Sequence, residues 1–141
     1  IDDRADVAVF ETAPLEAPCR LAGPVDLALD LSSPCRALDV VAILSRVRPD
    51  GRAATLAQGV RRLGSQAREA VDVSLRAVCA TAEPGERLRL SIAGSAWPAI
   101  AVNPGDGTRP ETAPPIARRP IPISVLTGGD NASRLVLSTA P

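Results

Sequence analysis

The sequence predicts an all-β protein, a β-sandwich of about eight or nine short strands with little helix. Segments of about four to eight residues in which apolar and polar side chains alternate recur along the 141-residue chain. Turn-forming residues separate these segments, and the chain contains 14 Pro and 10 Gly. No segment keeps the helical spacing of apolar residues for the length of a long helix. Together these observations favour a sandwich over a helical or mixed fold.

The first two strands are predicted on either side of a connector. Residues 5–12 alternate apolar and polar side chains and predict an opening strand. Residues 13–24 contain Pro14 and Pro18, which cannot propagate a helix, so we predict an irregular connector there. Residues 25–33 show the cleanest period of two, with Val and Leu on one face and mostly Asp, Ala and Ser on the other. This pattern indicates a strand with one face in water.

Residues 38–61 are the stretch around which we expect the fold to be built. The apolar run at 40–44 is too short and too β-branched for a free-standing helix, so it predicts a strand whose start is buried on both faces. The Pro-Asp-Gly sequence at 49–51 suits a turn, and residues 52–57 would return as the partner strand. The simplest prediction is a β-hairpin at the centre of a sheet.

Residues 56–69 are ambiguous between strand and helix. Leu56, Val60 and Leu63 lie at helical spacing. Gly59 and Gly64, however, each weaken a helix by about 1 kcal/mol relative to Ala. We therefore favour an irregular strand, with a short helix as the alternative.

The remaining strand pattern consists of short alternating segments between turns, with one long interruption. Residues 103–120 have no periodicity and many prolines. Loops this long inside a compact domain are usually functional, interface-forming or disordered. The other expected strands are 70–77, 87–92, 121–127 and 134–138, with turns at 83–86 and 128–131.

The composition predicts an aliphatic core and hints at a longer parent. Phe10 and Trp97 are the only aromatic residues, and Lys, His, Tyr and Met are absent. We interpret the Arg-only basic residues as the base-composition drift of a GC-rich genome. Because the chain does not begin with Met, we expect a fragment or a processed chain. Trp97 is expected to pack in the core, with a role at a domain interface as the alternative.

Charge and hydropathy argue against nucleic-acid and membrane partners. The formal net charge is zero, and Arg is scattered among Asp and Glu without a basic stripe or an aromatic stacking surface. No window approaches 18 apolar residues, and the start shows no signal-peptide pattern. We therefore expect a soluble chain without nucleic-acid or membrane partners, in the cytoplasm rather than secreted.

The sequence offers no catalytic residues. Without His, neither a Ser-His-Asp nor a Cys-His arrangement can be assembled from this chain. The Gly-Ser pairs at 64–65 and 94–95 do not belong to a GxSxG elbow, and we interpret both as turns. Asp26 and Asp30 fall on the expected solvent face of one strand, where acidic residues are common, so we assign them no catalytic role.

No cofactor or metal site is predicted either. Phosphate-binding glycine loops are absent, and the Gly-Asp-Gly at 105–107 lacks the further acids of a calcium loop. The spacing of Cys19, Cys35 and Cys79 does not suit zinc, so we expect three free thiols. A disulfide between Cys19 and Cys35 is the alternative if the parent is exported.

An ordered set of short motifs resembles a known family. It is similar to the C-terminal domain of the X-Pro dipeptidyl-peptidase and bacterial cocaine esterase (CocE/NonD) group of serine hydrolases. The motifs appear in the family's order and cover nearly the whole chain. They are FETAPLEAP (10–18), Gly23-Pro24-Val25, VRPDGRA (47–53), PGERLRLSI (84–92), Trp97-Pro98 followed by Asn103-Pro104, and SRLVLSTAP (133–141).

The resemblance implies a jelly-roll β-sandwich of the galactose-binding-like type, formed by residues 1–141 as one domain at the C-terminal end of a larger α/β-hydrolase. In family members this domain packs on an α/β-hydrolase domain that carries the Ser, Asp and His. The parent would hydrolyse ester or X-Pro peptide bonds through an acyl-enzyme. This domain would help shape the active-site mouth, with Trp97 and Asn103 at a possible interdomain interface and a homodimer surface possible. No triad residue has a counterpart here.

The chain also departs from the family. Family members commonly have His where Glu86 stands, and aromatic residues in the segment after Arg61. The alternative from another class is a stand-alone module that binds carbohydrate or a protein partner, although two aromatic side chains offer little platform for sugars. A structural or oligomerising domain without a ligand is the third hypothesis.

Overall fold

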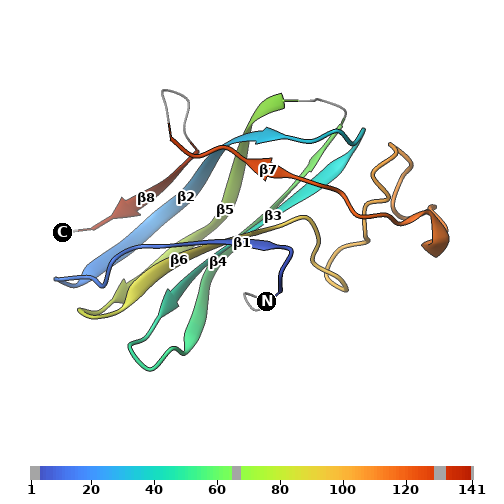
Figure 1. Cartoon of the computed structure of the whole chain (residues 1–141). Coiled ribbons are helices and arrows are strands. Elements are labelled where there is room, and N and C mark those ends of the chain that lie inside the picture. Colours follow the sequence, from blue (N-terminus) through green and yellow to red (C-terminus); the bar gives the residue numbers. More distant parts are fainter. Residues whose placement is uncertain (1–3, 65–67, 129–132, 141) are drawn as a thin grey trace.

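The computed structural model describes residues 4–64, 68–128 and 133–140. Within these ranges the chain forms eight strands and one short 3-10 helix, and the strands make two four-stranded antiparallel sheets (Figure 1). The predicted all-β jelly-roll sandwich is confirmed. None of the described segments forms a helix long and apolar enough to cross a membrane. The strands are β1 (Val7–Glu11), β2 (Cys19–Ser32), β3 (Leu38–Val47), β4 (Ala53–Leu63), β5 (Arg68–Ala82), β6 (Arg87–Ala93), β7 (Ser124–Val125) and β8 (Arg134–Thr139); the 3-10 helix is η1 (Pro115–Ala117).

The predicted hairpin has one interior strand and one edge strand of the first sheet. The first sheet runs β1-β6-β3-β4, so β3 is an interior strand and its hairpin partner β4 lies at the edge. The hairpin is confirmed, but only its first strand is central. The second sheet runs β5-β2-β7, and β8 pairs with β2 further along the same strand.

β2 begins earlier than predicted, and the connector expected at 13–24 is therefore too long. The strand pairs with β5 from Cys19 onward, and its register shifts between Gly23 and Val25. Gly23 has a φ of +129°, a region that glycine enters easily, and Pro24 sits in this bulge, where a missing amide donor is tolerated. The alternation of side chains continues through the shift, with Leu21, Val25 and Leu27 all buried, so it was the turn-forming Pro and Gly residues that made this part of the strand resemble a connector.

The ambiguous segment after residue 56 is a strand, as favoured, and the helical alternative is wrong. β4 continues to Leu63 in antiparallel register with β3. A register shift opposite Leu44 and Ser45 leaves Leu56 as an extra residue in β4. This bulge explains the irregular spacing that resembled a helix. Residues 65–67, including Ser65 of the predicted 64–65 turn, lie outside the described residues.

The closing strands differ in length from the prediction. Only Ser124–Val125 of the expected strand 121–127 forms a ladder, because Pro120 and Pro122 have no amide hydrogen to donate. β8 forms as predicted and pairs with β2. Most of the turn expected at 128–131 lies outside the described residues.

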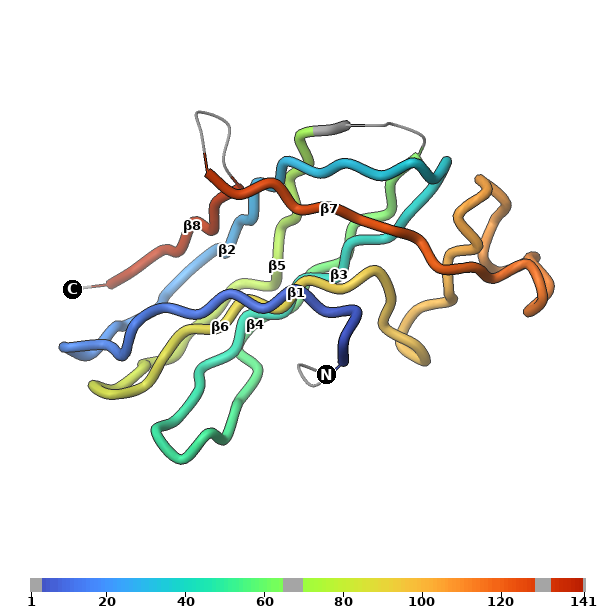
Figure 2. Tube along the Cα trace, in the orientation of Figure 1, coloured from blue at the N-terminus to red at the C-terminus, as the bar shows by residue number. Residues whose placement is uncertain are grey.

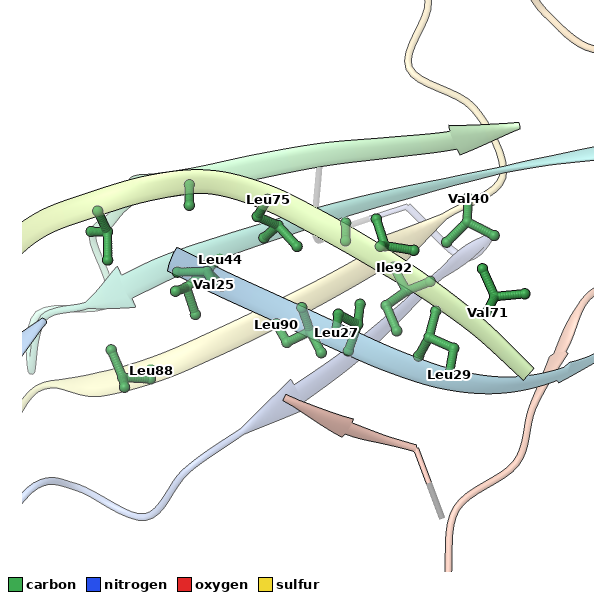
Figure 3. Close-up of a cluster of buried hydrophobic side chains, with 14 of the residues drawn as sticks. Val25, Leu27, Leu29, Val40, Leu44, Val71, Leu75, Leu88, Leu90 and Ile92 are labelled. Carbon is green, nitrogen blue, oxygen red and sulfur yellow. The ribbon is translucent and has the colours of Figure 1, made fainter. Parts of the chain in front are cut away.

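The inner faces of the two sheets form an aliphatic core, as the composition predicts. Leu21, Leu27 and Leu44 are fully buried there, and Figure 3 shows side chains from β2, β3, β5 and β6 meeting between the sheets. The outer face of β2 is less exposed to solvent than predicted. Asp26 is exposed, but Asp30 is buried because β7 and Ser133 cover that end of the strand.

Candidate interdomain surface

The long Pro-rich segment predicted at 103–120 belongs to a larger connection between β6 and β7, residues 94–123, called here the β6–β7 loop. Its only regular structure is the single turn of η1. Figure 2 shows it projecting beyond one end of the sandwich, opposite the end where β8 terminates. Because a loop of this length needs fixed attachment points to keep one conformation, its contacts with the sheets define the site.

A buried ion pair on the outer face of the first sheet provides the main attachment. Asp39 and Arg62 are cross-strand neighbours on β3 and β4. The Arg62 Nε and Nη2 atoms donate to the two Asp39 carboxylate oxygens at 2.8 and 3.0 Å, a bidentate arrangement. Asp39 is only 1% exposed. These hydrogen bonds to a carboxylate raise the pKa of Arg62 above its usual range.

The β6–β7 loop binds this pair through three groups. The Asn103 side-chain amide donates to Asp39 Oδ1 at 3.1 Å, and Arg62 Nη1 donates to Glu111 Oε1 at 3.2 Å. Arg62 Nη2 also approaches the carbonyl oxygen of Ala101 at 3.5 Å. One guanidinium on β4 therefore connects both halves of the loop to the sheet.

Asn103 also shapes the loop itself. Its Oδ1 accepts a hydrogen bond from the amide of Gly105 at 3.0 Å, which closes an Asx turn. Gly105 has a φ of +82°, and a Cβ there would lie 2.9 Å from the side chain of Ile121, so the position requires glycine. The Gly105 carbonyl in turn accepts from the amide of Arg36 at 3.1 Å. Asn103 is thus buried and positions the loop from inside the domain.

A second Asx turn follows at the loop surface. Asp106 Oδ1 accepts a hydrogen bond from the amide of Thr108 at 2.8 Å. This hydrogen bond lowers the pKa of the exposed Asp106 carboxyl. The Gly-Asp-Gly sequence at 105–107 is therefore a turn, as its lack of further acids suggested.

Trp97 behaves differently from Asn103, and the expectation that it packs in the core is wrong. Its side chain is 65% exposed, and the guanidinium carbon of Arg118 lies 5.7 Å from the ring centroid. Ile116, in η1, is 94% exposed. Large exposed apolar side chains on a well-anchored loop are typical of a surface that contacts another macromolecule.

Sequence reasoning missed Asp39 and Arg62. The available signal was an acidic residue at the start of an apolar run predicted to be buried on both faces. A buried carboxylate needs a charged or hydrogen-bonding partner, so this residue predicts an Arg in the adjacent strand. Because the partner Arg62 lies in residues 56–69, whose pattern is ambiguous between strand and helix, the sequence alone does not identify it.

Glu86, which stands where the family commonly has His, is buried at the end of the sandwich away from the loop. Its Oε2 accepts a hydrogen bond from the amide of Glu83 at 2.8 Å. Arg46 Nη1 and Arg48 Nε lie 3.8 and 3.9 Å from its carboxylate oxygens. Arg46 also donates to the carbonyl of Thr81 in the other sheet at 2.8 Å. The carboxylate closes a turn and lies beside Arg46, whose hydrogen bond to Thr81 joins the two sheets.

The described residues contain no group of three or more Cys, Asp or Glu arranged to hold a metal ion. Cys19, Cys35 and Cys79 are free thiols. The site thus consists of structural anchors and an exposed apolar tip.

Comparison with protein families decides what kind of domain carries this site. The family model of the X-Pro dipeptidyl-peptidase C-terminal non-catalytic domain matches residues 1–136. The chain belongs to this family. Among curated proteins, none matches the sequence.

Solved structures show the same fold inside larger hydrolases. An aminopeptidase from a marine sediment Thaumarchaeota archaeon matches with a TM-score of 0.90 and 22% identity, over 99% of this chain and 26% of that one. An α-amino acid ester hydrolase matches with a TM-score of 0.90 and 24% identity, over the same shares of the two chains. A CocE/NonD family hydrolase from Staphylococcus aureus matches with a TM-score of 0.76 and 18% identity, over 99% of this chain and 31% of that one. The domain thus spans about a quarter of the first two relatives.

Proposed function

We propose that this C-terminal domain is attached to an α/β-hydrolase domain of the same parent chain, a serine hydrolase that cleaves ester or X-Pro peptide bonds. The domain packs on the hydrolase domain and helps shape the mouth of its active site through the β6–β7 loop. Trp97 contacts the hydrolase domain, while Asn103 holds the loop in the conformation that presents Trp97.

The observation that carries this proposal is the match of a non-catalytic domain over residues 1–136, together with its 26% share of each of the first two relatives. The chain itself has no His and so cannot form the Ser-His-Asp relay of a serine hydrolase. The catalytic residues must then belong to the hydrolase domain, and this domain contributes a surface that contacts it. An anchored loop with an exposed Trp suits that role, because aromatic anchors dominate the energetics of protein interfaces.

The first test separates the domain from the parent. The 141-residue chain alone is expected to hydrolyse p-nitrophenyl acetate no faster than buffer, because it contains no imidazole to activate a nucleophile. Spectrophotometric assays of the isolated chain and of the whole product of its reading frame measure this directly. Turnover that persists through repurification and scales with the concentration of the isolated chain would contradict the proposal. So would a reading frame without an upstream strand–GxSxG–helix elbow.

A second test concerns Trp97. In the whole enzyme we expect Trp97→Ala to lower kcat/KM by about tenfold or more, since loss of a buried interface Trp typically costs about 2 kcal/mol. In the isolated chain the same change should alter the free energy of unfolding by less than about 1 kcal/mol, because Trp97 is exposed there. Trp97→Phe is the control and should retain most of the activity. A Trp97→Ala enzyme with wild-type kcat/KM would remove Trp97 from the proposed interface.

A further inference from the structure

The outer faces of the two sheets differ sharply in character. On the first sheet, the antiparallel register aligns side chains from all four strands into rows that cross the sheet. Two adjacent rows contain no charged residue. One row is Val7, Ala93, Val41 and Val60; the next is Val9, Ser91, Ile43 and Gln58.

Part of this uncharged surface is open. Ala93, Val41 and Ser91 are already buried by their neighbours, whereas Val7 and Ile43 are half-buried. Val9 and Val60, at the two edges of the sheet, are exposed. We call these two uncharged rows the strip. Its open positions lie on β1, β3 and β4, and the small side chains of Ala93 and Ser91 on β6 are buried between them.

Charged side chains border the strip on both sides. The row beyond Val9 contains Glu11 and Arg89, whose carboxylate oxygen and Nε lie 2.5 Å apart. The row beyond Val60 contains the Asp39–Arg62 pair. An uncharged centre with a charged rim is the usual anatomy of a protein interface.

The outer face of the second sheet lacks this arrangement. Its central rows are Ser74, Asp26 and Val136, and then Asp72, Ala28 and Arg134. Each row carries charge, and Ser74 donates a hydrogen bond to Asp26 at 2.9 Å. Val136 is 56% exposed, but charged and polar neighbours surround it. Burying this face would cost the desolvation of several carboxylates.

The β6–β7 loop and the chain direction point to the occupant of the first face. The loop is attached through Asp39 and Arg62, which belong to the row adjacent to Val60, so the attached part of the loop borders the strip. Because the family's domain is C-terminal, a catalytic domain joins the chain ahead of β1, the edge strand that contributes Val7 and Val9. In the first two relatives, about three quarters of the chain lies outside this domain.

We propose that the outer face of the β1-β6-β3-β4 sheet is the surface on which the hydrolase domain of the same chain packs, and that the outer face of the second sheet stays in water. This inference rests on the proposed function and adds the docking face to it. Ile43 on the interior strand β3, with Val9 and Val60 on the two edge strands, supplies its open apolar contacts, and the β6–β7 loop extends the interface from the Arg62 side.

The test compares matched substitutions on the two faces of the whole protein. Val60→Glu and Val136→Glu each place a carboxylate at an exposed valine of an edge strand, at 48% and 56% exposure. We expect Val60→Glu to increase the rate at which limited proteolysis releases the C-terminal domain by at least tenfold, because its charge would be buried against the hydrolase domain. Val136→Glu should leave the rate unchanged. Val9→Glu, at the opposite edge of the same face, should act like Val60→Glu.

Each other outcome overturns the docking face. Wild-type release rates in both Val60→Glu and Val9→Glu would place the interface elsewhere. Equal acceleration by Val136→Glu would mean general destabilisation. Conversion of a dimer to monomers by Val60→Glu, measured by sedimentation without faster release, would assign the face to a second copy. If the whole protein has no hydrolase domain or no hydrolase activity, the proposed function fails instead. The upstream sequence and the activity of the wild-type protein are therefore determined before any variant is made.

Discussion

Arg62→Ala is expected to lower the free energy of unfolding by about 3 kcal/mol, because it leaves the carboxylate of Asp39 buried without its charged partner. The effect lies at the lower end of the range for broken buried pairs, since the Arg62 side chain is 42% exposed and already partly solvated. Urea denaturation of the 141-residue chain measures the change. The β6–β7 loop should also become more susceptible to proteases, since Asn103 and Glu111 lose part of their attachment.

Arg61→Ala is the matched control on the same strand. Arg61 is exposed and pairs in register with Val40, on the opposite side of β4 from Arg62. Its removal should change the free energy of unfolding by no more than about 0.5 kcal/mol. Equal effects of the two substitutions would show that the Asp39 carboxylate does not depend on Arg62.

The second large effect is expected at Gly59, on the edge strand β4. Substitution of Gly by Ala usually stabilises a protein by about 0.4–1 kcal/mol where the backbone permits it. A Cβ at position 59, however, would lie 2.6 Å from the backbone carbonyl oxygen of Ser74 in β5. A backbone oxygen in a ladder cannot rotate away, so the two strand edges must separate. We expect Gly59→Ala to lower the free energy of unfolding by about 1–3 kcal/mol.

Gly64→Ala provides the comparison for this prediction. A Cβ at position 64 would have no atom within 4 Å, and its φ is not in the left-handed region. The same chemical change should therefore be neutral or slightly stabilising there. Thermal unfolding of both variants decides the matter, and a Gly59→Ala protein at least as stable as Gly64→Ala would contradict the close approach of β4 and β5.

Local pattern was sufficient for most of the strands and for the character of the core. The alternation after Val25 specifies which side chains face the other sheet, because the period of a strand is two. The apolar run before Ser45 predicts a strand buried on both faces, but not which of its side chains face the other sheet. The same reasoning was less successful where the register shifts. The Pro and Gly residues before Val25 made the start of β2 resemble a connector, and the extra residue Leu56 made β4 resemble a helix. A bulge is defined by the partner strand, so no single segment reveals it.

In the candidate site, too, some features follow from the sequence and others depend on the tertiary structure. The sequence alone determined the fold class, the aliphatic core, the lack of a His-based triad and the ordered motifs that resemble the family. It also marked Trp97 and Asn103 as residues of interest, but it could not separate their roles. Only the tertiary structure decided that Asn103 is buried against Asp39 and that Trp97 is exposed, and only the register of four strands assembled the uncharged strip between Val9 and Val60. These contacts join residues far apart in the chain, and their energies depend on burial and on neighbours that local periodicity does not contain.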